Sequence, residues 1–587
     1  MSILAVRAPR AEAVSLCLFE GEAETRVAME RQGEDWLAAA PPPGTCYGLR
    51  AHGVWTPEQG LWFDPAKLLV DPRAVELDRP FTYSAALSEY GVDTAALVPR
   101  AVMPGALPDM PREAPCFRRG GLIYEANVRG LTMLHPDVPE ARRGTVAALA
   151  HPAILAHLEK LHVSAIELMP ITAWIDERHL PPLGLSNAWG YNPVVPMALD
   201  PRLCPGGVVE LRETVAALHA RGIGVILDLV FNHTGESDVH GPVLSFRGLD
   251  NAAYAQNLDG SLINDTGCGN TLDFANPAVR ALVLESLRHF VRHCGVDGFR
   301  FDLAPIMARG PGFAADAPIF AEIAADPWLA DRVLIAEPWD IGPGGYQLGR
   351  FPANWLEWND RYRDDVRRLW RGDCAVGILA TRIAGSADIF GKDCRSVNFL
   401  AAHDGFTLAD TLAYNARRNH ANGEDNRDGH GENFSWNNGA EGASDDPAIR
   451  ARRDALARAM LGTLFVSTGT IQLTAGDEFG RSQQGNNNAY AQDNPLTWID
   501  WEGRDTALED HVAALAAWRA ARDCSQFPQD GTWTALDGQP MDASRWEDPA
   551  TTGFTWHSGA ETARPTGLRI DRAAPEAGPM VPSGHSF

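Results

Sequence analysis

The sequence predicts an α/β protein built around a (β/α)₈ barrel with long insertions, with a β-sandwich before the barrel and a short β region after it. Three observations support this prediction. The chain has 587 residues, which is more than one hydrophobic core normally holds. From Gly121 onward, apolar runs alternate with helical patterns. The runs are continuously apolar, as is typical of parallel strands buried on both faces.

About eight such runs can be assigned as strands. They are 122–128, 165–169, 224–230, 298–303, 333–336, 355–358, 396–402 and 471–475. Amphipathic helices are expected between several of them, at 208–221, 277–294 and 446–464, and a helix at 505–522 is expected to close the barrel. Strands joined by helical crossovers over roughly 400 residues favour a barrel. An open doubly wound sheet is the alternative, but the chain has no Gly-rich phosphate loop.

Three domains are predicted. Residues 1–110 contain short alternating stretches, such as 14–19 and 25–29, which are typical of a β-sandwich. A proline-rich segment at 95–115 indicates a linker to the barrel, which is expected over residues 111–523. The strand-like pieces 554–556 and 568–570 predict a small β region within residues 524–587.

The composition indicates which partners and which cell compartment to expect. The net charge of −25 argues against nucleic acid as a partner, because phosphate neutralisation requires clustered cations, whereas a neutral polysaccharide would not be repelled. The nine cysteines are scattered, and no C-x-x-C pair is present, which favours free thiols in a reducing compartment. Neither a signal peptide at Met1–Arg10 nor an apolar stretch of about 18 residues is evident. We therefore expect a cytoplasmic protein with no membrane partner.

Polar residues follow four of the predicted strands at the end where a barrel carries its catalytic groups. They are Asp228, Asn232 and His233 at the end of the third strand, Arg300 and Asp302 on the fourth, Glu337 after the fifth, and His403 and Asp404 after the seventh. Arg300 and Asp302 are two residues apart, so on a strand they point the same way, and the arginine would keep the carboxylate ionised. Taken singly, each residue could equally be a structural acid, an ion pair or a core histidine. Their convergence on one mouth favours an active site.

Two facing carboxylates are the minimum requirement for glycoside hydrolysis, and one of them must be protonated at rest. The four strand-end segments resemble the four signature regions of the α-amylase clan of retaining α-glucan enzymes, over about residues 121–522. The resemblance implies that Asp302 is the nucleophile, Glu337 the general acid/base and Asp404 the third catalytic carboxylate. It further implies that Arg300 holds the nucleophile and that His233 and His403 bind sugar hydroxyls. Asp228 and Asn232 are expected to support the same side of the site.

A finer resemblance is to the bacterial glycogen debranching enzymes and isoamylases. It rests on segments 123–132, 185–193, 266–271, 336–340, 422–429 and 485–490. It implies cleavage of α-1,6 branch linkages in glycogen or phosphorylase-limit dextrin, with release of short linear maltooligosaccharides, in glycogen catabolism. The N-terminal sandwich is similar to the glycogen-binding-type module of this group. The tail after Cys524 is shorter than the β domain usual in the family.

Aromatic rings that stack on sugar faces are expected at Tyr191, Trp189, Trp339 and Trp358, although most of the 17 tryptophans of the chain could equally be core residues. Tyr191 is the best candidate, because it falls in a matched segment. Trp339 lies two residues past Glu337, and we expect it to raise the pKa of that carboxyl by desolvation.

No metal and no cofactor are predicted. Glu424, Asp425 and Asp428 offer oxygen ligands, but their spacing is not that of a calcium loop, and a solvated loop at the rim for branched substrate is favoured. An isoamylase acting on long amylopectin chains, an α-1,4 hydrolase and a branching transglycosylase remain alternatives, since they share the catalytic carboxylates. A non-catalytic glucan-binding protein is disfavoured, because all three carboxylates are present. Preferred branch length and oligomeric state stay open.

Overall fold

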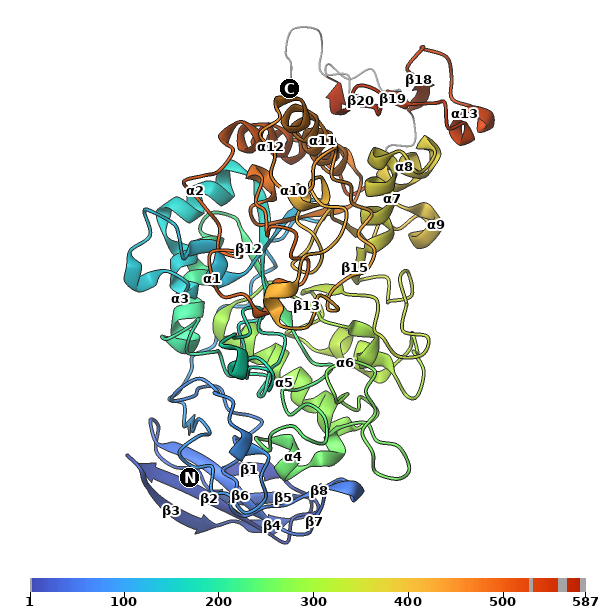
Figure 1. The fold of residues 1–587 in the computed structure, drawn as a ribbon. Helices are drawn as coiled ribbons and strands as arrows, with labels where there is room; N and C mark the ends of the chain where they lie inside the picture. Colours follow the sequence, from blue (N-terminus) through green and yellow to red (C-terminus); the bar gives the residue numbers. More distant parts are fainter. Residues whose placement is uncertain (1–2, 527–530, 558–566, 581–587) are drawn as a thin grey trace.

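The computed structural model of the protein describes residues 3–526, 531–557 and 567–580. Its centre is a closed barrel of eight strands in chain order, each parallel to its neighbours (Figure 1). The strands are β10 (Leu122–Ala126), β11 (Val163–Leu168), β12 (Gly224–Leu229), β13 (Gly298–Phe301), β14 (Val333–Ala336), β15 (Leu356–Asn359), β16 (Ser396–Asn398) and β17 (Thr470–Thr474). All eight predicted strands are confirmed, with ends that differ by a few residues.

The helices of the barrel region lie around the strands or in the loops that connect them. They are α1 (Val128–Thr132), α2 (Pro152–Lys160), α3 (Gly207–His219), α4 (Phe246–Leu249), α5 (Pro277–Cys294), α6 (Pro318–Ala325), α7 (Asp360–Arg371), α8 (Val376–Ile383), α9 (Ala387–Phe390), α10 (Leu408–Thr411), α11 (Pro447–Val466) and α12 (Thr506–Ala520). The predicted α5 is confirmed residue for residue, because its end signals are local. The Asn276 side chain accepts a hydrogen bond from Ala278 N, Pro277 opens the helix, and Gly295 ends it at φ 78°.

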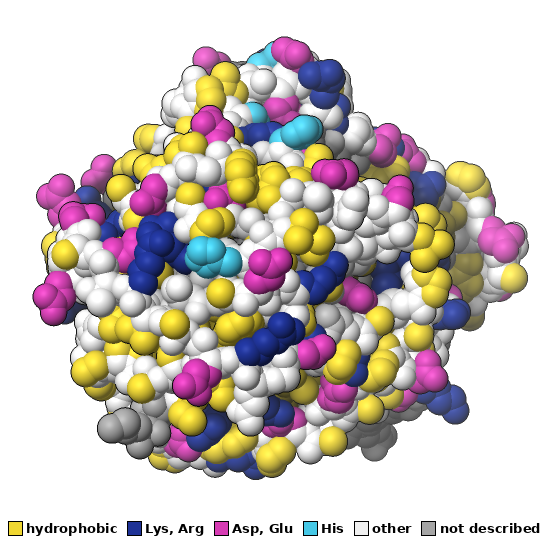
Figure 2. Space-filling model, turned by 90° about the horizontal axis from the view of Figure 1, so that it is seen from below, with side chains coloured by type: hydrophobic (Ala, Val, Ile, Leu, Met, Phe, Trp, Pro, Cys, Tyr) yellow, Lys and Arg dark blue, Asp and Glu magenta, His cyan; other side chains and the backbone are white. Residues whose placement is uncertain are grey.

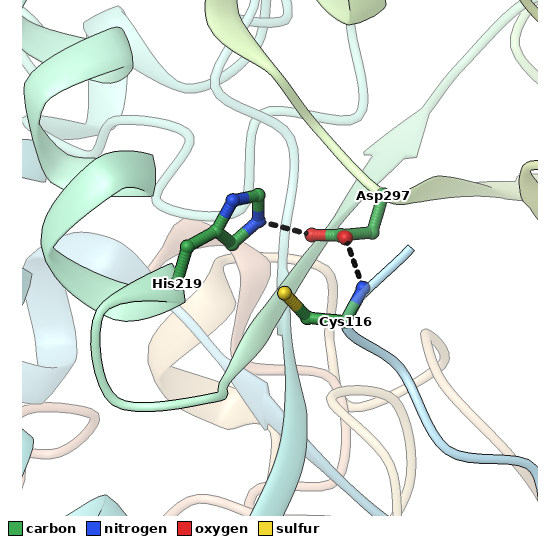
Figure 3. A group of neighbouring side chains, drawn as sticks. All are labelled: Cys116, His219 and Asp297. Carbon is green, nitrogen blue, oxygen red and sulfur yellow. Dashed lines mark hydrogen bonds and ion pairs between the residues drawn. The ribbon is translucent and has the colours of Figure 1, made fainter. Parts of the chain in front are cut away.

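A hydrogen-bonded cluster ties together three segments at the amino-terminal end of the strands (Figure 3). Asp297, one residue before β13, accepts hydrogen bonds from Cys116 N at 2.7 Å and Val225 N at 2.6 Å. It also lies 2.7 Å from Nε2 of His219, at the end of α3. Because each of these contacts is to a nitrogen that can donate, hydrogen bonding accounts for the cluster without a cation. The cluster fixes the incoming linker to the base of the barrel.

The N-terminal region forms two facing sheets and a small ribbon, with strand orders β1-β5-β4, β3-β2-β6-β9 and β7-β8. The strands are β1 (Ile3–Arg7), β2 (Ala13–Glu20), β3 (Ala23–Ala28), β4 (Glu30–Gln32), β5 (Asp35–Ala39), β6 (Cys46–His52), β7 (Trp55–Thr56), β8 (Leu61–Trp62) and β9 (Ala101–Val102). The core between them continues into barrel residues such as Ile175, Val194 and Leu244. The N-terminal region is therefore packed on the barrel. Its last strand, β9, lies inside the segment predicted to be only a linker.

One face of the molecule carries mixed charge. On the face shown in Figure 2, acidic and basic side chains are interspersed among apolar ones. On this face, the cations are therefore not gathered into a single patch. Among the described residues, no helix has the length and apolar character needed to cross a membrane.

The C-terminal region is a four-stranded antiparallel sheet packed on α11, at the opposite end of the molecule from the N-terminal sheets (Figure 1). Its strands are β18 (Thr532–Ala535), β19 (Gly553–His557), β20 (Gly567–Asp571) and β21 (Glu576–Met580), with helix α13 (Ala543–Glu547) between the first two. The two predicted strand pieces fall in β19 and β20. A β region in this part of the chain is therefore confirmed.

Gly462 of α11 allows β21 to lie directly against the helix. A Cβ at this position would come within 1.8 Å of the carbonyl oxygen of Ala577. We expect Gly462→Ala to push the C-terminal sheet off the helix and to cost about 1–3 kcal/mol, as overpacking does. Thermal unfolding measures this, with Gly431→Ala as the control, because a Cβ there meets open space. An unchanged midpoint for Gly462→Ala would show that the sheet does not depend on this contact.

Candidate active site

The side chains of β12 and β13 meet inside the mouth of the barrel. Asp228 and Arg300 are direct partners in the register of these two strands. Nη1 of Arg300 donates to both carboxylate oxygens of Asp228, at 2.9 and 3.0 Å, and to Oδ1 of Asp302 at 2.9 Å. Arg300 is fully buried. The predicted ion pair is therefore present, and the arginine holds two acids rather than one.

The same guanidinium reaches the predicted general acid. Nη2 of Arg300 lies 3.1 Å from Oε2 of Glu337, which follows β14. This oxygen also accepts a hydrogen bond from Leu303 N at 2.7 Å. Leu303 adopts a left-handed conformation, with φ 40°, which is costly for a branched side chain and tends to occur at functional sites. The turn after Asp302 thus directs a backbone donor at Glu337.

Asn232 contacts Asp302 directly. Its Nδ2 donates to Oδ2 of Asp302 at 2.8 Å and to the Asp302 carbonyl oxygen at 2.9 Å. His233 lies behind it, with Nδ1 2.5 Å from Oδ1 of Asn232 and Nε2 3.0 Å from the carbonyl oxygen of Tyr191. Both ring nitrogens of His233 therefore face protein groups. The predicted contact of His233 with a sugar hydroxyl stays a prediction.

His403 is held by an acid to which the sequence analysis gave no role. Its Nδ1 lies 2.9 Å from Oε1 of Glu125, whose Oε2 accepts a hydrogen bond from Thr474. Burial alone would lower the pKa of His403, but the hydrogen bond and charge of Glu125 raise it to about 9, so the imidazole is charged at neutral pH. The signal for Glu125 was present in the sequence, as a carboxylate inside an otherwise apolar strand.

Asp404 is kept ionised by histidines. Burial alone would raise its pKa, but a hydrogen bond to His430 and the charge of His403 hold the pKa well below its usual range. Nε2 of His430 lies 3.0 Å from Oδ2 of Asp404. His430 comes from the long insertion after β16, where no periodic pattern marks it, and the sequence analysis did not find it.

Two of the four predicted aromatic residues, Tyr191 and Trp189, pack against His403. The ring of Tyr191 stacks on His403 at 4.7 Å, and its hydroxyl donates to Asp228 at 2.5 Å. Trp189 stands edge-on to His403 at 5.0 Å. These two rings and Trp339 are partly exposed. The expectation for Trp358 was wrong, because this β15 residue points into the barrel, is 0% exposed and lies 4.3 Å from the Arg300 guanidinium.

A cleft of about 460 Å³ lies next to these residues, because its lining includes Asn192, which follows Tyr191 in the chain, and Tyr490, whose ring centroid lies 6.2 Å from that of Trp189. It is lined by loops that follow several strands and by Tyr83 of the N-terminal region; among the lining residues are Glu177, Asn192, Cys268, Glu424, Asp428 and Tyr490. Loop 422–429 therefore borders a cleft, which supports its predicted place at a rim. Glu424 accepts a hydrogen bond from Tyr490, and Asp428 accepts from Asn422 and Asn488. Two of the three acids weighed as calcium ligands are thus occupied by hydrogen-bond donors.

Glu337 has the properties of an acid catalyst. Burial, together with the negative charges of Asp302 and Asp404, raises its pKa to about 8 against the opposing charge of Arg300. At neutral pH the carboxyl is therefore protonated and can donate to a leaving oxygen.

This protonation gives a pH dependence with a definite sign. As the pH rises through the pKa of Glu337, near 8, the proton needed by the leaving group is lost, so kcat/KM should fall on the alkaline side. Initial rates on a branched glucan between pH 5 and 10 test this. A control substrate with a fluoride leaving group needs no proton and should not show the alkaline fall. A fall of equal size on both substrates would contradict the assignment.

Named proteins are similar in sequence to this chain over most of its length. The glycogen debranching enzyme of Serratia proteamaculans (strain 568) is 46% identical over 568 residues, which cover 92% of this chain and 86% of that protein. The chain belongs to the glycogen debranching enzyme family. The enzyme of Cronobacter sakazakii (strain ATCC BAA-894) is likewise 46% identical, over 94% of this chain and 86% of that protein. Family membership confirms the prediction of a glycoside hydrolase of the α-amylase clan that acts on α-1,6 linkages.

Solved structures confirm the fold of this family member. The pullulanase from Bacillus acidopullulyticus superposes with a TM-score of 0.71 at 20% identity, over 97% of this chain and 68% of that chain. The catalytic module of the glycogen-degrading pneumococcal virulence factor SpuA gives a TM-score of 0.74 at 18% identity, over 97% and 87% of the two chains. No family model matches the sequence.

Proposed function

We propose that this debranching-family enzyme hydrolyses α-1,6 branch linkages in glycogen or phosphorylase-limit dextrin with retention of configuration, and releases short linear maltooligosaccharides. One observation above all supports the site assignment. The Arg300 guanidinium contacts Asp228, Asp302 and Glu337 at once. An attacking carboxylate beside a protonated carboxyl is the pair that retaining glycosidases use.

In the first step, Asp302 attacks the anomeric carbon of the side-chain glucose that is joined to O6 of the main chain. Arg300 and Asn232 hold its carboxylate by hydrogen bonds, which fixes its direction. As the bond to the leaving oxygen breaks, Glu337 transfers its proton to that oxygen. A covalent glycosyl ester forms on Asp302, and the main chain leaves with a free hydroxyl.

In the second step, Glu337 is ionised and acts as a base. It takes a proton from water, whose oxygen attacks the anomeric carbon and displaces Asp302. Two inversions at the same carbon give retention. The mechanism requires the two carboxyls to lie about 5–5.5 Å apart in the productive state.

Asp404 and His403 are proposed to bind hydroxyls of the same glucose. An ionised carboxylate accepts from sugar hydroxyls, and a charged imidazole donates to them, so the pair is complementary to a vicinal diol. Tyr191 supplies the flat ring beneath this glucose, and Trp189 and Trp339 border it. The cleft beside the site has room for further glucose units of a branched glucan.

We further propose three domains, 1–110, 111–523 and 524–587, with the first as a glycogen-binding-type module, and a cytoplasmic location without a metal requirement. The packing of the N-terminal core on barrel loops supports a module that adjoins the cleft.

The test of the proposed function is chain-length analysis of the products from phosphorylase-limited glycogen, with amylose as the control. Release of short linear maltooligosaccharides from the branched substrate, with amylose unchanged, is expected. Rapid shortening of amylose would mean an α-1,4 hydrolase. Release of long chains from amylopectin in preference to short stubs would mean an isoamylase, and an increase in branching would mean a transglycosylase.

A further inference from the structure

Four buried asparagines join two long loops above the mouth of the barrel. Asn419 and Asn422 belong to the insertion after β16, and Asn486 and Asn487 to the segment after β17; all four are at most 2% exposed. Their side chains bond across the two loops. Asn419 Nδ2 donates to Asn487 Oδ1 at 2.8 Å, and Asn486 Nδ2 donates to Asn422 Oδ1 at 3.0 Å. Because buried amides need partners for both donors and acceptors, such an interlocked set favours one relative position of the loops.

Asn487 links this asparagine cluster to the predicted catalytic carboxylate. Its backbone carbonyl accepts a hydrogen bond from Gly405 N at 2.8 Å, one residue past Asp404. Its side-chain Nδ2 donates to the carbonyl oxygen of His430 at 2.9 Å. One asparagine thus fixes the backbone beside Asp404 and the backbone of His430 in a single arrangement.

The side chain of His430 extends from this anchored backbone to Asp404. Its Nε2 lies 3.0 Å from Oδ2 of Asp404, while 47% of the side chain remains exposed. Asp404 is ionised and can only accept, so Nε2 is the donor. Arg363 and His403 also act on Asp404 through their charge. Among these groups, His430 makes the direct hydrogen bond.

We propose that His430 is a positioning residue for Asp404: it holds one carboxylate oxygen so that the other faces the sugar hydroxyls, and the buried asparagines hold His430 in place for this task. The inference rests on the proposed function, in which Asp404 binds the glucose at the cleavage site. It assigns a structural role to segments 422–429 and 485–490, which resemble those of the debranching enzymes and which the proposed mechanism does not use directly.

Three substitutions at His430 test the proposal on phosphorylase-limited glycogen. His430→Ala should lower kcat about tenfold with a smaller change in KM, since it removes one hydrogen bond to a charged group. His430→Gln should recover most of the loss, because its terminal nitrogen can occupy the position of Nε2. His430→Asn should not, because its shorter amide places a nitrogen near the position of Nδ1. The unfolding midpoint should be unchanged in all three, because the side chain is half exposed.

His420→Ala is the matched control, because His420 is an exposed histidine ten residues earlier in the same insertion. Retention of wild-type kcat by His430→Ala, or an equal loss in the Ala and Gln variants, would overturn the proposal. Asp404→Asn separates this outcome from failure of the proposed function. If Asp404→Asn is inactive while His430→Ala behaves as wild type, only the role of His430 is wrong. If Asp404→Asn is fully active, the assignment of the site itself fails.

Discussion

Replacement of Asp302 by asparagine should lower kcat on a branched glucan by at least about 10⁴-fold, because no covalent intermediate can form without the nucleophile. Asparagine keeps the shape of the side chain and can still face Asn232 and Arg300. The loss should therefore come with a nearly unchanged unfolding midpoint. Product release followed over hours by chain-length analysis measures an effect of this size.

Replacement of Glu337 by glutamine provides the paired experiment. On glucan it should cost about 10²–10⁴-fold, the usual contribution of general acid catalysis. On a maltosyl fluoride, whose leaving group needs no proton, the first step should proceed, whereas Asp302→Asn should be inactive on both substrates. If the initial burst of fluoride release, which reports the first step alone, were as impaired in Glu337→Gln as the reaction on glucan, its proposed role as proton donor would be wrong. If Asp302→Asn remained active on either substrate, another residue would be the nucleophile.

Replacement of Arg300 by methionine should cost about 3–5 kcal/mol of folding stability, the usual result of removing one partner from a buried ionic group. Arg300 is fully buried and contacts Asp228, Asp302 and Glu337, so its loss leaves three acids without their shared cation. The fall in kcat should be about 10²–10³-fold or more, because a preorganised donor to the nucleophile is lost.

The pH dependence of the stability loss in Arg300→Met distinguishes unpaired buried acids from a simple loss of packing. Burial already raises the pKa of Asp228 to about 6 and that of Glu337 to about 8 despite Arg300, and without the arginine these two folded-state pKa values rise further above the unfolded ones. The folded variant then binds more protons than the unfolded chain, so its stability falls as the pH rises. Urea unfolding at pH 5 and pH 8 should show a larger deficit at pH 8.

Arg427→Met is the control for this experiment, because 81% of that arginine side chain is exposed. A deficit for Arg300→Met that does not change with pH would mean that lost packing, rather than unpaired acids, is the cause.

The sequence alone predicted those elements and site residues whose signal is local or repeated along the chain. The barrel strands are recognisable because burial on both faces makes them continuously apolar, and α5 because Asn276, Pro277 and Gly295 mark its ends. The carboxylates at the ends of β12, β13 and β14 could be found because a barrel brings all strand ends to one mouth. Family resemblance added roles that no spacing could supply.

Only the tertiary structure decided which groups meet. The sequence allows Trp358 to be a ring that stacks on a sugar face, yet the pleat of β15 turns it into the barrel beneath Arg300. Glu125 and His430 have no sequence pattern that pairs them with His403 and Asp404, because 278 and 26 residues separate the members of these pairs. Local periodicity fixes the elements of this protein. Hydrogen bonds between distant loops fix the protonation and direction of the proposed catalytic groups, and those bonds exist only when the barrel is closed.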